Sequence, residues 1–83
     1  MRIRDKAVIL EILKQHKGNS RARIIAAAGI SRELGYFMLD EMEDEGWIEL
    51  TQIGDRDAKW AYGTRRGFEW LKRFYKFIDN KGE

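Results

Sequence analysis

The stretch AAGIS, residues 27–31, separates two segments in which apolar residues recur at helical spacing. Gly29 can adopt the left-handed backbone that commonly ends a helix, and Ser31 is a favourable N-cap for the next one. The chain is therefore expected to leave one short helix and enter another within a few residues, with the amide end of the second helix exposed. This is the arrangement of a helix-turn-helix, which also occurs as a purely structural element in many helical domains.

Helical patterns also occupy the segment before this turn. Asp5 is a favourable N-cap for a first helix, which Gly18 ends, and Asn19 and Ser20 can cap the short second helix. The apolar stripe of the first helix is made of Val8, Ile9, Ile12 and Leu13. After the turn, residues 32–45 predict a third helix, ended by Gly46, whose core-facing stripe is Leu34, Met38, Leu39 and Met42.

The pattern changes from helical to alternating after Gly46. Residues 47–53 and 59–62 carry β-branched and aromatic residues, and a charged tip at 54–57 interrupts them, which predicts a β-hairpin. Thr64 is a plausible N-cap for a last helix, which we expect to fray at residues 80–83. The predicted fold is α+β and mainly α: a winged helix-turn-helix of three helices, a two-stranded hairpin wing and a C-terminal helix.

Composition limits what the chain can be. Its 83 residues allow a single domain, with 1–64 forming the winged helix-turn-helix and 65–83 the C-terminal helix of the same domain. The net charge is only +2, so any affinity for nucleic acid depends on where the charges lie. The chain has no cysteine, and its apolar runs are far shorter than the roughly 20 residues that span a bilayer, so we expect a cytoplasmic protein that is neither exported nor membrane-inserted.

Three stretches of the chain carry a family resemblance. They are RII (23–25) leading into GIS (29–31), LDEM (39–42) followed by EGWIE (45–49), and YGTRRG (62–67) followed by FEWL (68–71). Together they resemble small archaeal winged-helix DNA-binding proteins, chromatin-like and regulatory, that dimerise through a helix after the wing. The resemblance implies the winged-helix fold, binding to double-stranded DNA and a homodimer, but it implies no particular target sequence.

Candidate DNA-binding residues lie at the helix starts and on the wing. The first turns of the second helix of such a motif read base edges, while basic residues around it contact phosphates. The acidic residues between 40 and 45 would be repelled by phosphates, so that half of the helix must point away from the duplex. The candidates are Arg21, Arg23, Ser31, Arg32, Glu33, Tyr36, Phe37, Arg56 and Lys59. Solvated surface charges are the alternative interpretation of the basic ones.

Gly35 is an unusual residue inside the third helix. A glycine there costs about 1 kcal/mol relative to alanine, so it needs a reason. Close approach of the backbone to DNA and close packing against the preceding helix are the two that we consider.

No catalytic or metal site is predicted. His16 is the only histidine and has no cysteine or second histidine to join it as a ligand. The acidic cluster at 40–45 lacks the spacing of a calcium loop and is expected to be a solvated face. Nothing supplies a nucleophile with an orienting group, so we expect neither an enzyme nor a cofactor.

The last helix carries more apolar residues than one domain can bury on one side. One stripe is Phe68, Leu71, Tyr75 and Ile78, and a second is Trp70, Phe74 and Phe77. Pairing with a second copy of the chain would bury the surplus. The alternative is that Trp70 and Phe77 cap an enlarged core within one chain.

The sequence thus favours a sequence-selective or architectural DNA-binding protein, nucleoid-associated and acting as a homodimeric transcriptional regulator. A winged helix used for protein–protein interaction, without DNA binding, is the main alternative. An RNA-binding module would need the rings of Tyr36 and Phe37 exposed for stacking. A small-molecule sensor would need a pocket in the aromatic interface, for which no polar ligand set is evident.

Overall fold

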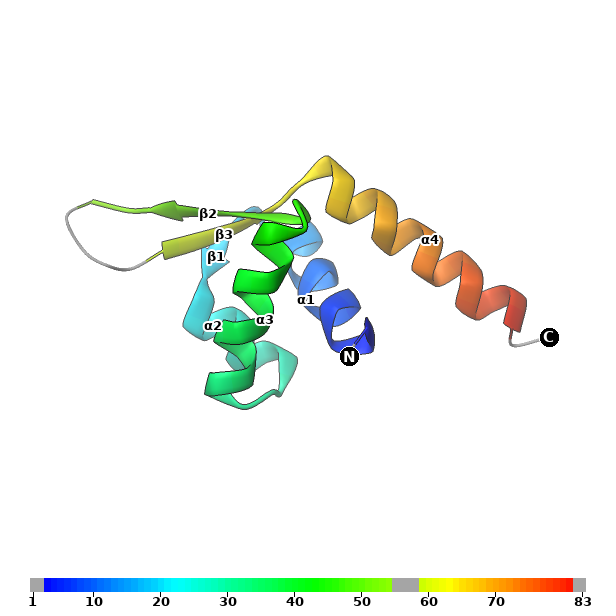
Figure 1. The fold of residues 1–83 in the computed structure, drawn as a ribbon, viewed down its shortest axis with the longest axis horizontal. Coiled ribbons are helices and arrows are strands. Elements are labelled where there is room, and N and C mark those ends of the chain that lie inside the picture. Colours follow the sequence, from blue (N-terminus) through cyan, green and yellow to red (C-terminus); the bar gives the residue numbers. More distant parts are fainter. Residues whose placement is uncertain (1–2, 55–58, 82–83) are drawn as a thin grey trace.

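The computed structural model describes residues 3–54 and 59–81, with side chains to residue 79. The elements in chain order are α1 (Ile3–Gln15), β1 (Asn19–Ser20), α2 (Arg21–Ala28), α3 (Arg32–Asp44), β2 (Ile48–Gln52), β3 (Lys59–Gly63) and α4 (Arg65–Lys81). Figure 1 shows α1, α2 and α3 grouped together, the β2–β3 hairpin extending to one side and α4 running away to the other. The predicted winged helix is confirmed. None of the described helices is both long and apolar enough to cross a membrane.

The wing belongs to a three-stranded antiparallel sheet in the order β1-β3-β2. Strand β1 was not predicted, because two polar residues give no alternating signal; it is held by pairing of Asn19 with Ala61 and of Ser20 with Trp60. Ser20 is also the predicted N-cap of α2, and its hydroxyl accepts a hydrogen bond from the Arg23 amide at 3.3 Å. The short strand therefore fixes the start of α2 relative to the wing.

The turn between α2 and α3 has the predicted geometry. Gly29 ends α2 with a φ of 70°, and the hydroxyl of Ser31 accepts from the Leu34 amide at 3.3 Å to cap α3. A Cβ on Gly35 would lie 2.5 Å from Cγ1 of Ile25 on α2, which is too close for any side chain. Close packing of α3 on α2, rather than approach to DNA, therefore accounts for this glycine.

The hydrophobic core lies where α1, α2, α3, the wing and the first half of α4 meet. Its buried members are Ala7, Ile9, Leu10, Leu13, Ile24, Ile25, Met38, Leu39, Met42, Ile48, Ala61 and Leu71. The prediction for α1 was partly wrong: the helix begins at Ile3, so Asp5 lies inside its first turn, and Val8 is 38% exposed while Leu10 is buried. The reason is that α1 packs against α2, β3 and α4 at once, which turns a different face inward.

Helix α4 is joined to the body by a cap and a ring stack. Thr64 caps it as predicted, accepting from the Gly67 amide at 3.1 Å and donating to the Gly46 carbonyl at 2.6 Å. Trp70 stacks on Trp47 with ring centroids 4.3 Å apart, and Phe74 follows at 5.3 Å from Trp70. The helix continues to Lys81, slightly beyond the residue at which fraying was expected.

Candidate nucleic-acid interface

Arginines lie in the first turns of both helices of the helix-turn-helix. Arg21 directly follows Ser20, the cap of α2, and Arg23 lies in the same first turn. Arg32 directly follows Ser31, the cap of α3. The amide end of a helix carries partial positive charge, so cations are unfavourable there unless an anion outside the helix neutralises them. Arginines in the first turns of both helices therefore form a surface suited to phosphate.

A cation–π contact joins the two helices at this surface. The guanidinium carbon of Arg21 lies 4.9 Å from the ring centroid of Tyr36 on α3. Arg32, one turn earlier on α3, borders a hollow of 200 Å³ with Ala22 and Ala26 of α2. The structure thus brings Arg21, Tyr36 and Arg32 together along the α2–α3 junction, and it half-buries the Tyr36 ring.

The outward side of α3 changes character along its length. Glu33 and Phe37 are exposed in its first half, and Phe37 is 63% exposed. Asp40, Glu43 and Asp44 are exposed in its second half. Only the first half of α3 therefore offers a surface that a polyanion can approach.

Two of the acidic residues are held by a lysine that sequence reasoning did not single out. The Lys6 side chain is buried, and its ammonium lies 2.8 Å from a carboxylate oxygen of Glu41 and 3.2 Å from one of Glu45. Burial lowers the pKa of Lys6, but hydrogen bonds to these glutamates and their charge outweigh it, so the pKa lies above its usual 10.5. The ammonium also lies 5.5 Å from the ring centroid of Trp47.

The expectation that residues 40–45 form a solvated face is therefore correct only in part. Glu41 and Glu45 are half-buried against Lys6 of α1. One oxygen of Glu43 accepts a hydrogen bond from the Leu50 amide of β2 at 3.2 Å. The cluster fastens α3 to α1 and to the wing. A sequence signal for Lys6 existed: it stands at helical spacing before Ile9, Leu10 and Leu13 on the buried face.

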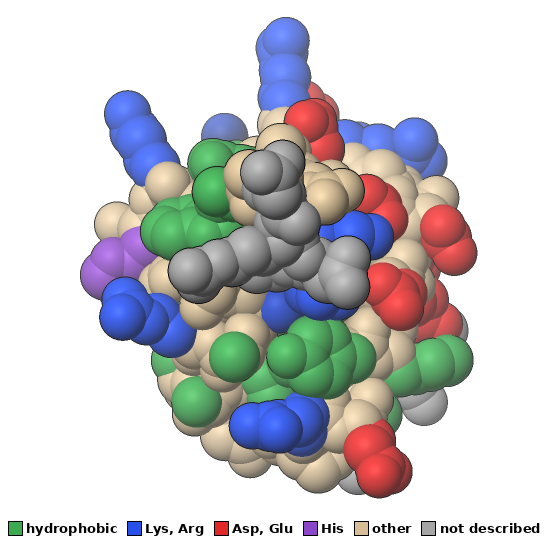
Figure 2. Space-filling view, turned by 90° about the vertical axis from the view of Figure 1, so that its left-hand side faces the viewer, with side chains coloured by type: hydrophobic (Ala, Val, Ile, Leu, Met, Phe, Trp, Pro, Cys, Tyr) green, Lys and Arg blue, Asp and Glu red, His purple; other side chains and the backbone are tan. Residues whose placement is uncertain are grey.

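The wing contributes one of its two predicted basic residues to the described structure. Lys59 is exposed at the start of β3, whereas Arg56 lies outside the described residues. Viewed toward the wing in Figure 2, Lys and Arg side chains lie above, below and to the left of it, while most Asp and Glu side chains gather on the right. The acidic side chains are therefore unevenly distributed around the wing.

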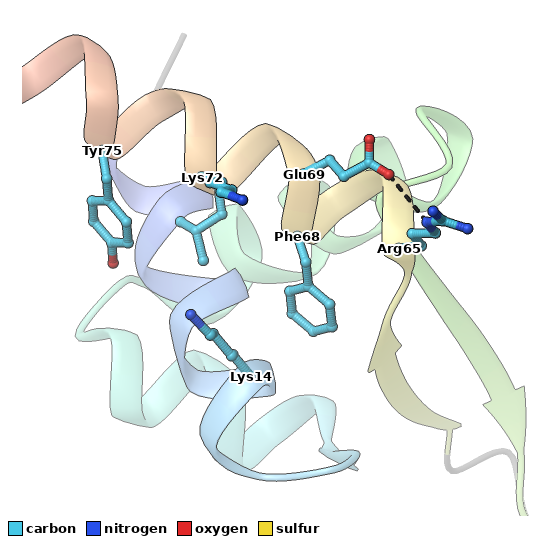
Figure 3. Close-up of a pocket in the computed structure, with 7 residues that line it drawn as sticks. Lys14, Arg65, Phe68, Glu69, Lys72 and Tyr75 are labelled. Carbon is cyan, nitrogen blue, oxygen red and sulfur yellow. Dashed lines mark ion pairs between the residues drawn. The ribbon is translucent and has the colours of Figure 1, made fainter.

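Two grooves run between α4 and α1 on the other side of the molecule. The larger, of 750 Å³, includes Phe68, Tyr75 and Lys72 of α4 and Lys14 of α1. Figure 3 shows Phe68 and Tyr75 projecting toward α1. At the edge of this groove Arg65 forms an ion pair with Glu69, with nitrogen and oxygen 3.3 Å apart. The smaller, of 260 Å³, lies among Val8, Ile12, Phe74 and Tyr75. Both are open and largely apolar, which suits a protein surface better than an enclosed ligand.

A hydrogen bond fastens α4 across the smaller groove. The hydroxyl of Tyr75 donates to a carboxylate oxygen of Glu11 at 2.7 Å. This bond lowers the pKa of Glu11 below its usual 4.5 and raises the pKa of Tyr75 above its usual 10.0.

The residues assigned to a dimer interface divide into two groups. Leu71 is buried in the chain's own core, Phe68 and Phe74 are half-buried against it, and Trp70 stacks on Trp47, so these four help to hold α4 to its own domain. Leu71 in particular is 2% exposed and is not available to a partner, which corrects the expectation. Tyr75, Phe77 and Ile78 remain on the surface, Phe77 at 60% exposed.

Over residues 3–54 and 59–81, no group of His, Cys, Asp and Glu side chains is arranged to hold a metal ion. His16 is exposed after the end of α1.

Solved structures share this fold. No protein-family model matches the sequence, and no curated protein sequence is significantly similar to it. The transcriptional repressor CouR, bound to a 23-mer DNA duplex, is 27% identical with a TM-score of 0.78, over 88% of this chain and 52% of CouR.

Two further structures show the same likeness at lower identity. The PcaV transcriptional regulator from Streptomyces coelicolor is 13% identical with a TM-score of 0.83, over 92% of this chain and 57% of PcaV. F93 from STIV, a winged-helix DNA-binding protein, is 17% identical with a TM-score of 0.76, over 94% of this chain and 89% of F93.

The likeness to the larger regulators is partial in length. The chain spans about half of BpsR and PcaV, at 54% and 57%, and a similar share of a MarR-family regulator from Rhodococcus, at 56%, whereas it spans most of F93. It thus has a winged-helix fold that resembles those of MarR-family transcriptional regulators and of F93.

Proposed function

We propose that the protein binds double-stranded DNA through the α2–α3 junction and acts as a homodimeric, nucleoid-associated transcriptional regulator. The observation that carries this proposal is the α2–α3 junction, where the Arg21 guanidinium lies 4.9 Å from the Tyr36 ring centroid and Arg32 borders a hollow with Ala22 and Ala26. Arg23 lies in the same first turn of α2 as Arg21. Arginines at one surface can provide the phosphate contacts from which most affinity for DNA derives.

The proposed docking follows from where these groups lie. The first half of α3 enters the major groove, with Arg32, Glu33, Tyr36 and Phe37 near base edges and Ser31 capping the helix. Arg21 and Arg23 contact phosphates, and the wing, with Lys59 and Arg56, follows the backbone. Lys6 offsets part of the negative charge of Glu41 and Glu45, which reduces the repulsion that α3 would otherwise exert on the duplex.

The surface that α4 leaves uncovered supports the proposed homodimer. Tyr75, Phe77 and Ile78 of α4 and Ile3 and Val8 of α1 are all exposed. We propose that residues 65–83 pair with those of a second copy, while residues 1–64 bind DNA. Two α3 helices would then contact half-sites about 34 to 36 Å apart, one turn of the duplex, or a multiple of it. CouR, which is bound to DNA in its structure, supports the DNA-binding part of the proposal.

The decisive experiment measures affinity for random-sequence duplex DNA over a series of salt concentrations, with sedimentation of the same samples. A steep linear fall of log affinity with log salt, and two chains per complex, is the expected result. Arg23→Ala should reduce the salt slope by about 2 for a complex with two chains, because it removes one phosphate contact from each chain. Arg73→Ala removes the same charge from α4 and should leave the slope unchanged.

Arg32→Ala tests base contact separately. If Arg32 makes a bidentate contact to guanine, the variant should bind a preferred duplex about 1 to 3 kcal/mol more weakly and lose selectivity at that position. Affinity that does not change would remove Arg32 from the site.

A protein-interaction module is the second candidate. The exposed Asp40 one turn after Phe37, and the exposed Asp44 two turns after it, favour this candidate, because such a surface suits a basic, apolar partner better than a phosphate backbone. Absence of duplex binding even at low salt would support this candidate against DNA binding.

A further inference from the structure

Phe37 is the apolar side chain that the fold leaves outermost on α3. It is 63% exposed, while the apolar residues of α3 that face inward, Met38, Leu39 and Met42, are buried. It is separated from the core-facing stripe by the helical rotation, so a shift of its rotamer does not bury it. The Phe37 ring is therefore available for contact with a group outside the chain, on the helix that we propose to contact DNA.

The charges around Phe37 limit which group can contact its ring. Glu33 stands one turn before it and Asp40 one turn after it, and both are exposed. Carboxylates at these positions repel phosphates, so this strip of α3 does not lie along the DNA backbone. On the floor of the major groove, by contrast, a carboxylate can accept a hydrogen bond from the amino group of cytosine.

Only one apolar group is displayed on the base edges of the major groove, the 5-methyl group of thymine. Single-stranded nucleic acid would instead offer base faces for stacking. The half-burial of Tyr36 under Arg21 leaves Phe37 as the single well-exposed ring on this part of α3, which suits a point contact with a methyl group better than a stacking platform.

We propose that Phe37 is a specificity-determining residue that contacts the 5-methyl group of a thymine in the major groove. The inference rests on the proposed DNA binding and deepens it: the preferred duplex carries a thymine at the position that Phe37 reaches. Contact with one methyl-sized group corresponds to about a fourfold change in affinity, since burial of such a group contributes about 0.8 kcal/mol.

The test removes the methyl group from the DNA and the ring from the protein. A preferred duplex is first selected from a random pool by the wild-type chain, and each thymine is then replaced singly by deoxyuridine. The wild type should lose about fourfold in affinity at one or two positions and nothing elsewhere. In Phe37→Ala, affinity for the thymine and uracil duplexes should become equal at those positions, while the salt slope stays as in the wild type.

Controls separate this result from failure of the fold or of DNA binding. Phe37→Ala should unfold at the temperature of the wild type, because the ring is largely exposed. Phe77→Ala removes an equally large exposed ring from α4, and the thymine-to-uracil ratio should stay as in the wild type whatever happens to overall affinity.

Three results would overturn the inference while leaving DNA binding in place. These are selection without a preferred sequence, no loss at any deoxyuridine, and a loss that persists in Phe37→Ala. Tighter binding to single strands than to the duplex would also overturn it, in favour of base stacking. Absence of all duplex binding would overturn the proposed function with it.

Discussion

Lys6 shows how one side chain controls the electrostatics of the candidate recognition helix. A buried ammonium needs anionic partners, and Glu41 and Glu45 supply them from α3. The same contacts hold the second, acidic half of α3 against α1. The interaction therefore serves both stability and the orientation of α3.

Substitution of the two glutamates and substitution of Lys6 should change the free energy of unfolding by different amounts. Glu41→Gln with Glu45→Gln leaves a buried cation without its anions, and we expect a loss of about 1 to 3 kcal/mol in the free energy of unfolding. Lys6→Met should cost less, because methionine fills the space and the freed glutamates, each about a third exposed, can be hydrated. Urea unfolding of both variants checks this, and an equal cost would contradict it.

The contact between α2 and α3 depends on an absent side chain. A Cβ at Gly35 would meet Cγ1, Cγ2 and Cδ1 of Ile25 at 2.5 to 2.8 Å. Gly35→Ala should therefore destabilise the protein by about 1 to 3 kcal/mol through overpacking, although alanine is the better helix former.

Steric conflict predicts rescue from the other helix. Ile25→Ala removes the three atoms that Gly35→Ala would meet, so the double variant should be less destabilised than the sum of the singles. Thermal unfolding of the four proteins provides this cycle, and strictly additive costs would contradict the packing explanation.

The hydrogen bond from Tyr75 to Glu11 makes the docking of α4 on α1 sensitive to acid. The pKa of Glu11 is lowered in the folded chain, so its contribution to stability is present above the unfolded value of 4.5 and is lost as pH falls through the folded pKa. Tyr75→Phe removes the donor that causes this shift. The variant should be less stable than the wild type at pH 7 and approach it in acid.

Thermal unfolding from neutral pH to about one unit below the unfolded pKa of Glu11 tests this dependence. A gap between wild type and Tyr75→Phe that stays constant over this range would show that the bond is not the cause. Glu11→Gln is the matched control, since it should remove the acid-dependent part without loss of the phenol.

Sequence patterns within a few residues of each other predicted most of the helices and strands. Serine caps, Gly29 and the change of period placed α2, the turn, α3 and the wing, and hence the arginines at the helix starts. Strand β1 was not predicted, because the residue that Asn19 pairs with, Ala61, lies about forty residues away in the chain. The prediction that Val8 is buried on α1 was wrong for the same reason, since elements from later in the chain decide which side of α1 is buried.

The candidate site divides in the same way. The positions of Arg21, Arg23 and Arg32 follow from nearby caps, so sequence alone could place them. The contact of Arg21 with Tyr36 and the pairing of Glu41 and Glu45 with Lys6 depend on how α1, α2 and α3 pack together. No periodicity within one element contains that information.

At the scale of the whole molecule, α4 leaves the body and makes the chain elongated. The described structure measures 50 × 25 × 21 Å, and Figure 1 shows the C-terminal part of α4 pointing away from the other helices. Rings near its start pack on the core, whereas Phe77 and Ile78 are 60% and 42% exposed. The helix is therefore anchored at one end and offers an apolar surface at the other.

Phe77→Ala with Ile78→Ala should convert the proposed dimer to a monomer at micromolar concentration, because it removes apolar surface that one chain cannot bury. Since both residues are exposed, the fold itself should persist, and the unfolding temperature should lose its dependence on protein concentration. Sedimentation measures the first effect. Lys76→Ala with Asp79→Ala changes polar exposed residues of the same helix and should leave the dimer intact.

The same variant connects assembly to DNA. If two copies place their α3 helices on successive turns of the duplex, the wild type should prefer two half-sites over one far more strongly than the monomeric variant does, because the second contact is then intramolecular. The variant should bind a single half-site as the wild type does. A variant that still sediments as a dimer would place the interface elsewhere, and a wild type indifferent to the second half-site would separate dimerisation from DNA recognition.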